Sequence, residues 1–355
     1  MSSPALWFQG FPRHPAAAAE LSENGRLTEK GTNYVFSEDL AAAVEVAMGL
    51  GRPLLVTGEP GCGKTELGYA IARRLAIAQL YYFSVKSNSE ARDVLYTYDA
   101  IERFGEAQAQ QLAAAGGARR LPDVGEYIQY QALGQAILDA HPRGAVTALL
   151  RSPWYQHPGG PRRSVVVIDE IDKATRDFPN DLLREIEDLS FRVPEYLRGS
   201  RDAPGAPGGA TPSGAEISPE HRPIIVITSN EENQLPDAFL RRCVFFQVPF
   251  PEPPVLRQII AGALAKSSGR IAPGFHLTLA DNDRDALIDL LLAFRDQPIE
   301  KKPGISEMID AAHLVAYPAG APPPPLDARL KATRTALAKL KGDGVAFDQL
   351  RSGAP

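Results

Sequence analysis

The chain has 355 residues, of which 44% are hydrophobic and 23% charged, enough for one large and one small globular domain. Its net charge of -5 gives no overall positive field to attract nucleic acid, although a local basic loop could still do so. The two cysteines, Cys62 and Cys243, are too few for a disulfide framework. No basic segment precedes an apolar one at the N-terminus, and no apolar run approaches about 18 residues. We therefore expect a cytoplasmic protein without membrane insertion.

The first elements in chain order are an arm, a helix and a strand–loop–helix unit. Residues 1–33 contain prolines and an alanine run without helical periodicity, which predicts a loosely held N-terminal arm. A helix is expected from about Ser37, which can cap it. Between Arg52 and Ile77, the apolar run PLLVT, a glycine-rich loop and a helical pattern follow one another. This order predicts half of a βαβ unit.

Three further apolar runs, at residues 80–85, 164–169 and 224–229, predict buried strands. Continuous apolar runs of this kind are typical of parallel strands that helices cover on both faces. Residues 34–250 are therefore expected to form an α/β domain with a doubly wound parallel sheet.

Two long segments interrupt the alternation of strands and helices. Residues of about 91–160 are too many for a simple crossover and predict an insertion, with helical pieces at 91–104 and 132–140. Residues of about 198–219 lack apolar side chains to bury. They predict a flexible loop that could face a pore or a partner.

The C-terminal part has a helical pattern. Residues 251–320 predict a smaller α-helical lid domain, with helices over 254–266, 281–295 and 306–316. Residues 321–355 predict a proline-rich linker, a basic amphipathic helix at about 327–341 and a tail.

The segment GEPGCGKT, from Gly58 to Thr65, fits the phosphate-loop motif and lies between an expected strand and helix. Its glycines allow backbone N–H groups to face a phosphate, and the following helix adds its positive dipole. Lys64 is expected to reach the β- and γ-phosphates, and Thr65 to offer a hydroxyl to Mg²⁺. The predicted ATP-binding residues are Gly58, Glu59, Pro60, Gly61, Cys62, Gly63, Lys64, Thr65 and Glu66. The alternative is a glycine-rich turn.

The loop also contains Cys62, which lies at a helix N-terminus next to cationic Lys64 in the sequence. Both features favour a thiolate, which predicts an ATPase sensitive to thiol modification. The alternative is that Cys62 fills space as a small side chain.

An apolar strand that ends in carboxylates, VVVIDEID, follows about a hundred residues later. Asp169 is expected to hold Mg²⁺, and Glu170 to orient and deprotonate the water that attacks the γ-phosphate. A helix N-terminus that merely gathers acidic residues is the alternative.

The strand at 224–229 runs into Asn230, whose amide could hold the attacking water beside Glu170. Asn is also a common capping residue. The adjacent Arg241 and Arg242 follow a short expected helix. Such a pair usually forms surface salt bridges. The order of phosphate loop, acids, amide and arginines instead favours an oligomeric ATPase in which an arginine completes a neighbour's site.

These segments together resemble the AAA+ superfamily of P-loop NTPases and, within it, the MoxR-like ATPases. The resemblance covers about residues 34–316 and rests on GEPGCGKT, YIQYQALGQAI, VVVIDEID, LLREIEDLSFRVPE and ITSNEENQLPDAFLRRC. It implies a hexameric ring with ATP at the subunit interfaces. It also implies that Arg242, preferred over Arg241, is the arginine finger. Ser306 stands where many relatives have a lid arginine, and Lys302 is a possible substitute.

The resemblance further implies a chaperone-like ATPase that remodels or activates a partner protein complex, in some relatives with a von Willebrand factor A domain partner. One alternative is a nucleotide-gated signalling or defence scaffold with slow turnover. The other is a nucleic-acid motor, which the net acidity and the missing basic-aromatic stripe disfavour.

Overall fold

The computed structural model describes residues 20–32, 34–113, 123–198, 217–230, 235–271 and 276–352. These residues form two compact units. The described residues of 20–32, 38–57 and 65–246 belong to the first unit, and those of 34–37, 58–64 and 247–352 to the second. Most of the predicted arm and of the predicted loop at 198–219 lies outside the described residues.

A sheet of seven strands forms the centre of the first unit among the described residues, in the order β2-β1-β4-β7-β8-β3-β9. The strands are β1 (Leu21–Glu23), β2 (Arg26–Thr28), β3 (Leu54–Gly58), β4 (Gln79–Ser84), β7 (Val165–Asp169), β8 (Ile224–Thr228) and β9 (Val244–Val248). The pairs β4–β7, β7–β8 and β8–β3 are parallel. The predicted parallel α/β core is confirmed, because the apolar runs form neighbouring strands.

Helices cover both faces of this sheet. On one face, α4 (Ala132–Ala140) and α6 (Phe178–Asp188) share a core with alternate strand residues such as Val166 and Ile168. The intervening Val167 points to the opposite face, where it meets Gly68 of α2 (Lys64–Arg74). The strands carry no polar alternation because both of their faces are buried.

Apart from α3 (Ala100–Ala113), which is described below, the remaining helices of the first unit connect the strands and are short, except for α1. They are α1 (Glu38–Leu50), α5 (Arg143–Val146), α7 (Glu195–Arg198), α8 (Asp237–Leu240), and the 3₁₀ helices η1 (Ala91–Val94), η2 (Val124–Tyr127), η3 (Thr147–Leu149) and η4 (Ile171–Lys173). The prediction of a helix from about Ser37 is confirmed by α1.

The N-terminal residues that the structure describes are not a loosely held arm. β1 pairs antiparallel with β2 and parallel with β4, so this hairpin extends the sheet beyond β4. Three-residue strands are too short to show a two-residue periodicity, and β4, the parallel partner of β1, lies more than fifty residues away in the sequence. The prediction over residues 1–33 is therefore wrong where the hairpin forms.

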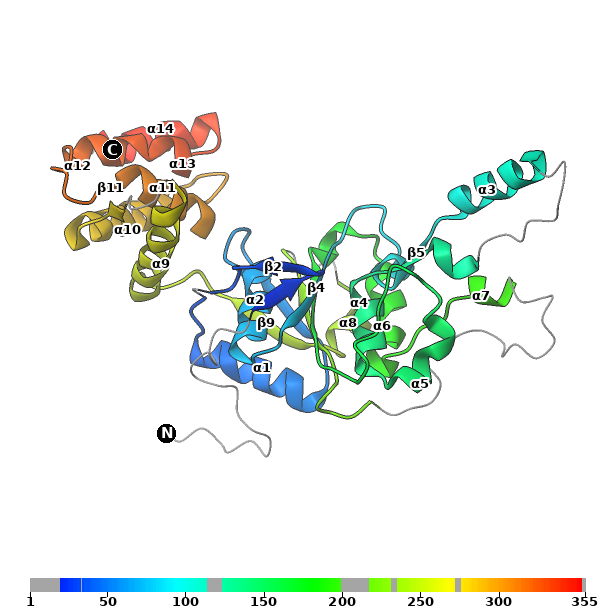
Figure 1. The fold of residues 1–355 in the computed structure, drawn as a ribbon. Helices are drawn as coiled ribbons and strands as arrows, with labels where there is room; N and C mark the ends of the chain where they lie inside the picture. The colour runs from blue at the N-terminus through cyan, green and yellow to red at the C-terminus, as the bar shows by residue number, and fades with distance from the viewer. Residues whose placement is uncertain are drawn as a thin grey trace. The chain divides into compact units, whose positions relative to one another are not determined.

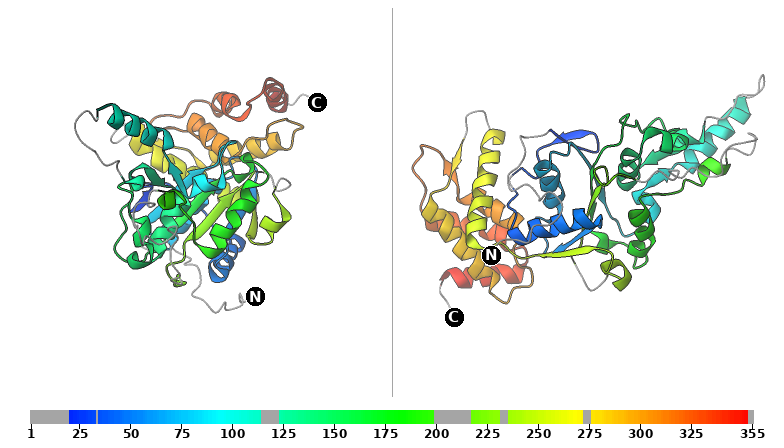
Figure 2. Two further views of the ribbon diagram at one scale, coloured as in Figure 1. Left: turned by 90° about the vertical axis from the view of Figure 1, so that its right-hand side faces the viewer. Right: turned by 90° about the horizontal axis from the view of Figure 1, so that it is seen from below.

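The predicted insertion contains one core helix and one excursion. α4 packs on the sheet as the crossover between β4 and β7. Before it, β5 (Tyr96–Tyr98) and β6 (Ile128–Tyr130) pair antiparallel, and α3 (Ala100–Ala113) lies between them in the chain. Figures 1 and 2 show α3 extending away from the sheet. The single helical piece predicted at 91–104 is wrong, because a 3₁₀ turn and a strand precede α3.

The second unit has a helical core of its own. Its elements are α9 (Pro253–Ile271), β10 (Leu277–Thr278), α10 (Asp281–Arg295), α11 (Ile305–Val315), β11 (Tyr317–Pro318), α12 (Leu326–Ala332), α13 (Arg334–Leu337) and α14 (Lys341–Ser352). The predicted lid helices are confirmed by α9, α10 and α11. The prediction of a single helix at 327–341 is wrong, because the chain forms the three helices α12, α13 and α14 between residues 326 and 352. Leu337 and Phe347 are fully buried in the same core as Met308.

None of the helices among the described residues combines the length and the apolar character that crossing a bilayer requires.

The close approach of α2 to β7 generates a stability prediction. A Cβ at position 68 would overlap with the Val167 side chain, whereas position 105 of the exposed helix α3 has open space. We expect Gly68→Ala to lower the free energy of unfolding by about 1–3 kcal/mol through overpacking. Gly105→Ala, the matched control, should raise it by up to about 1 kcal/mol through helix propensity. Urea unfolding of both variants tests this, and equal effects would contradict the close packing.

Candidate functional site

The phosphate loop belongs to the second unit. Gly58, Gly61 and Gly63 have φ values of 147°, 76° and 90°, which residues with a Cβ rarely adopt. Lys64 is 7% exposed, and its Nζ donates to the carbonyl oxygens of Gly58 at 2.8 Å and Glu59 at 2.9 Å. The ammonium therefore lies inside the turn that the motif predicts.

Residues of α11 and α10 contact this loop within the second unit. The backbone N–H of Ile305 donates to the Gly61 carbonyl oxygen at 3.0 Å. Arg295, which is 7% exposed, donates from Nη2 to Glu59 Oε2 and from Nη1 to the Pro303 carbonyl oxygen, both at 2.5 Å.

The guanidinium of Arg295 also stacks on Phe250, 3.6 Å from the ring centroid. In the sequence, Ser306 stands where a lid arginine is expected, with Lys302 as a possible substitute. Both residues are exposed, and Arg295 was not singled out.

The surroundings of Cys62 disfavour a thiolate. Its side chain is 4% exposed and packs in the core of the second unit, and burial raises the pKa of the thiol more than the neighbouring Lys64 lowers it. The alternative of a small filling side chain fits this environment. The prediction of thiolate character is wrong because the motif does not tell which side of the loop the residue faces.

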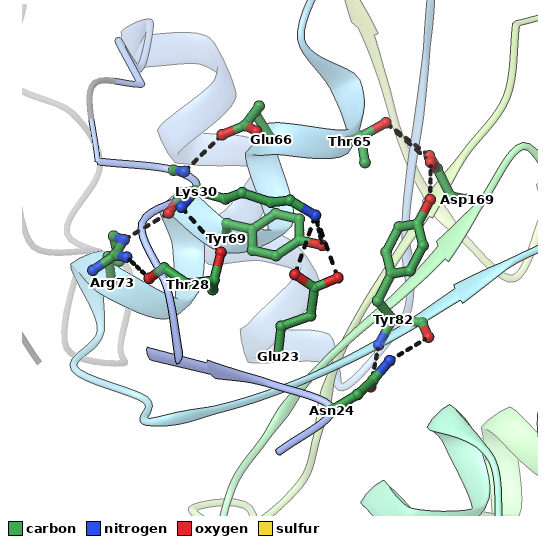
Figure 3. Close-up of polar contacts among 11 residues, drawn as sticks. Glu23, Asn24, Thr28, Lys30, Thr65, Glu66, Tyr69, Arg73, Tyr82 and Asp169 are labelled. Atoms are coloured by element: carbon green, nitrogen blue, oxygen red, sulfur yellow. Dashed lines mark hydrogen bonds and ion pairs between the residues drawn. The ribbon is translucent and has the colours of Figure 1, made fainter. Parts of the chain in front are cut away.

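Asp169, the predicted metal ligand, lies in the first unit, at the carboxyl end of β7. Asp169 is 6% exposed, and its carboxylate accepts from the Thr65 hydroxyl at 2.9 and 3.1 Å. The Thr228 hydroxyl donates to Oδ1 at 2.6 Å, and the Tyr82 hydroxyl donates to Oδ2 at 2.8 Å (Figure 3). Tyr82 and Thr228 were not predicted, because a single polar residue in an apolar strand does not reveal its partner.

Thr65 and Asp169 form a donor set that suits Mg²⁺. The Thr65 hydroxyl donates its hydrogen to Asp169, so the lone pairs on its oxygen remain for a cation. Hydroxyl, carboxylate and water oxygens are the ligands that this hard cation prefers.

Glu170 follows directly after the strand in a left-handed conformation, with φ 59° and ψ 51°. Its N–H donates to the Thr228 hydroxyl at 2.9 Å, so one threonine contacts both acids. Its carboxylate pairs with Lys173 at 2.5 Å and is one-third exposed. The hydrogen bond with Glu170 raises the pKa of the exposed Lys173.

The last three predicted site residues, Asn230, Arg241 and Arg242, lie after β8. The N–H of Asn230 donates to Asp172 Oδ1 at 3.0 Å, which keeps this residue near the end of β7. Arg241 and Arg242 are both exposed. Arg242 Nε pairs with Glu187 of α6 at 2.6 Å, so the surface ion pair considered from the sequence forms within the chain.

Glu66, predicted to bind the nucleotide, points instead to the N-terminal segment. Its Oε2 accepts from the Gly31 N–H at 2.6 Å (Figure 3). It therefore stabilises the packing of that segment on α2.

A parallel α/β sheet with a phosphate loop, two acids at the carboxyl end of β7 and a helical C-terminal part defines a P-loop nucleotide-binding protein with the AAA+ fold. The profile of the AAA domain (dynein-related subfamily) matches residues 53–243, more than half of the chain. The chain therefore belongs to this family. No curated protein matches the sequence at a significant level.

Among solved structures, the chain is similar to a RuvB mutant from Thermotoga maritima, with a TM-score of 0.41 and 16% identity over 81% of this chain and 65% of that one. The FIGL-1 AAA domain in complex with ADP gives 0.35 and 15% over 86% and 72%. The T. maritima RuvB Holliday junction branch migration motor gives 0.39 and 16% over 78% and 59%. The chain thus spans less than two thirds of each RuvB structure. Likeness at this level carries no argument about function.

The burial of Cys62 generates a prediction about its chemistry. Because burial raises the pKa of this thiol, little thiolate forms near neutral pH, and alkylation of the folded protein should be slow. Iodoacetamide labelling at pH 7.5, followed by mass spectrometry, should modify Cys62 rapidly only after unfolding. Cys243, also buried and with a pKa raised to about 12, is the internal reference. Rapid native labelling of Cys62 alone would contradict this environment.

Proposed function

We propose that this protein is a Mg²⁺-dependent ATP hydrolase of the MoxR-like kind, which assembles as a ring of identical subunits and remodels a partner protein complex. The observation that carries the proposal is the pairing of the Thr65 hydroxyl with Asp169, next to Glu170 at the same strand end. In this arrangement the Thr65 hydroxyl is an oxygen ligand for a metal, and the Asp169 carboxylate lies within hydrogen-bond distance of it. The Glu170 carboxylate can contact a water.

Each residue then has a separate task in hydrolysis. Lys64 would contact the β- and γ-phosphates, and Thr65 and Asp169 would hold the metal. Mg²⁺, when bound, supplies charge neutralisation at the phosphate oxygens. Glu170 exchanges its contact with Lys173 for the attacking water and accepts a proton from it. Asn230 orients the same water.

A protein client is favoured over nucleic acid. The net charge of -5 gives no general attraction to a phosphate backbone. The resemblance to MoxR-like ATPases supports a client protein complex and a von Willebrand factor A domain partner. Salt-dependent binding assays with DNA and RNA separate the two classes.

The assignment of Lys64 and Glu170 predicts two different defects. Lys64→Ala removes a phosphate contact and should abolish ATP binding. Glu170→Gln keeps the shape of the site and should bind ATP normally, yet hydrolyse it about 100-fold or more slowly. Calorimetric titration and phosphate release measure the two properties. Asp188→Asn, which neutralises an exposed carboxylate paired with Arg184 on α6, is the control and should retain the parental rate. If Glu170→Gln hydrolyses ATP at the parental rate, Glu170 is not the catalytic base.

The ring predicts that Arg242 acts in a neighbouring subunit. Arg242→Ala should bind ATP normally but hydrolyse it about 10³-fold more slowly, since an added cation stabilises the transition state. Glu187→Ala breaks the same surface pair and keeps the arginine, so it should remain active. Equal losses in both variants would assign Arg242 a structural role.

Mixing two inactive variants completes this test. Glu170→Gln subunits have an inactive site and an intact arginine, and Arg242→Ala subunits have the reverse. Their co-assembly should restore ATPase activity at junctions where an intact site meets an intact arginine. If co-assembled subunits stay inactive at every ratio, shared sites must be abandoned.

A further inference from the structure

Tyr82 contacts Asp169, the predicted metal ligand, although the proposed mechanism gives this tyrosine no task. Its hydroxyl donates to Asp169 Oδ2 at 2.8 Å, while the Thr228 hydroxyl donates to Oδ1 at 2.6 Å. With donors on both oxygens, the carboxylate plane has a defined orientation.

The backbone of Tyr82 is held by the N-terminal hairpin (residues 21–28). Asn24 Oδ1 accepts from the Tyr82 N–H at 3.0 Å, and its Nδ2 donates to the Tyr82 carbonyl oxygen at 3.1 Å (Figure 3). Asn24 has a φ of 47° and precedes Gly25, with a φ of 85°, in the turn between β1 and β2. One amide in a turn thus satisfies both backbone groups of the residue that reaches Asp169.

The segment that follows the hairpin contacts α2. The Gly31 N–H donates to Glu66 at 2.6 Å, and Arg73 Nε donates to the Lys30 carbonyl oxygen at 2.6 Å. A Cβ at position 31 would lie 2.5 Å from the Ala70 nitrogen, so only glycine allows this approach. The N-terminal segment therefore contacts both α2 and β4, and each of these elements supplies a hydroxyl donor to Asp169.

We propose that Tyr82 is a positioning residue for the divalent cation of a bound nucleotide, and that the N-terminal hairpin sets its position. The inference rests on the proposed function. Without the phenol, Asp169 Oδ2 keeps only the longer contact from Thr65, at 3.1 Å, and the carboxylate can rotate away from the metal side. Metal binding must then also supply the free energy needed to orient the Asp169 carboxylate. This lowers the affinity for the metal–nucleotide complex but not for the nucleotide alone.

The test measures metal dependence rather than activity. The 355-residue chain is titrated with a fluorescent, non-hydrolysable ATP analogue in EDTA and in saturating Mg²⁺. The measured quantity is the Kd in EDTA divided by the Kd in Mg²⁺. Tyr82→Phe should lower this ratio about tenfold, the usual minimum for loss of a group that orients a metal ligand. Its Kd in EDTA should be unchanged.

Tyr81→Phe is the matched control. Tyr81 is adjacent on β4, and its hydroxyl donates to buried Asp139 at 2.7 Å on the opposite face of the sheet. This variant also loses a tyrosine–aspartate hydrogen bond, but it should keep the parental ratio. If both variants change alike, or if Tyr82→Phe keeps the parental ratio, the positioning role is refuted.

Asn24→Gly tests the hairpin, since glycine keeps the left-handed turn but removes the amide. A smaller fall in the same ratio is expected, and a parental ratio would refute the role of the hairpin. If the parental protein binds the analogue equally in EDTA and in Mg²⁺, the proposed Mg²⁺-dependent function fails first. If instead the parental protein binds the analogue more tightly in Mg²⁺ and Tyr82→Phe has the same ratio, only the positioning role of Tyr82 is refuted.

Discussion

The carboxylate of Asp169 is the group on which the geometry at the carboxyl end of β7 depends. A buried carboxylate without partners would be costly, and this one accepts from hydroxyls on α2, β4 and β8. The three elements are far apart in the sequence. Because each donor must reach the same two oxygens, the helix after the phosphate loop and the strands on either side of β7 have little freedom to shift independently.

The sequence was sufficient where chemistry and pattern coincide in a short segment. The phosphate loop, the acids after β7 and the apolar strands were predicted because each is defined by neighbouring residues. The two adjacent tyrosines of β4 show the limit. Tyr81 binds Asp139 on one face and Tyr82 binds Asp169 on the other, but the sequence alone does not tell which tyrosine faces which layer.

Contacts between segments that are distant in the sequence account for most of the remaining differences between the sequence-based predictions and the structure. Arg295 lies at the end of an ordinary amphipathic helix, and only folding brings it to Glu59. The buried Asp343 accepts from the N–H groups of Glu300 and Lys301, which ties α14 to the segment before α11. A composition rich in charge and proline therefore concealed a folded C-terminal part.

The pairing of β1 with β4 also has a consequence for how copies of the chain meet in solution. Without the hairpin, the apolar six-residue strand β4 would be an edge strand with unpaired N–H and C=O groups. Such an edge strand can recruit a strand from another molecule. The edge strand β2 is only three residues long and begins with Arg26, which makes it a poor template for intermolecular strand addition and aggregation.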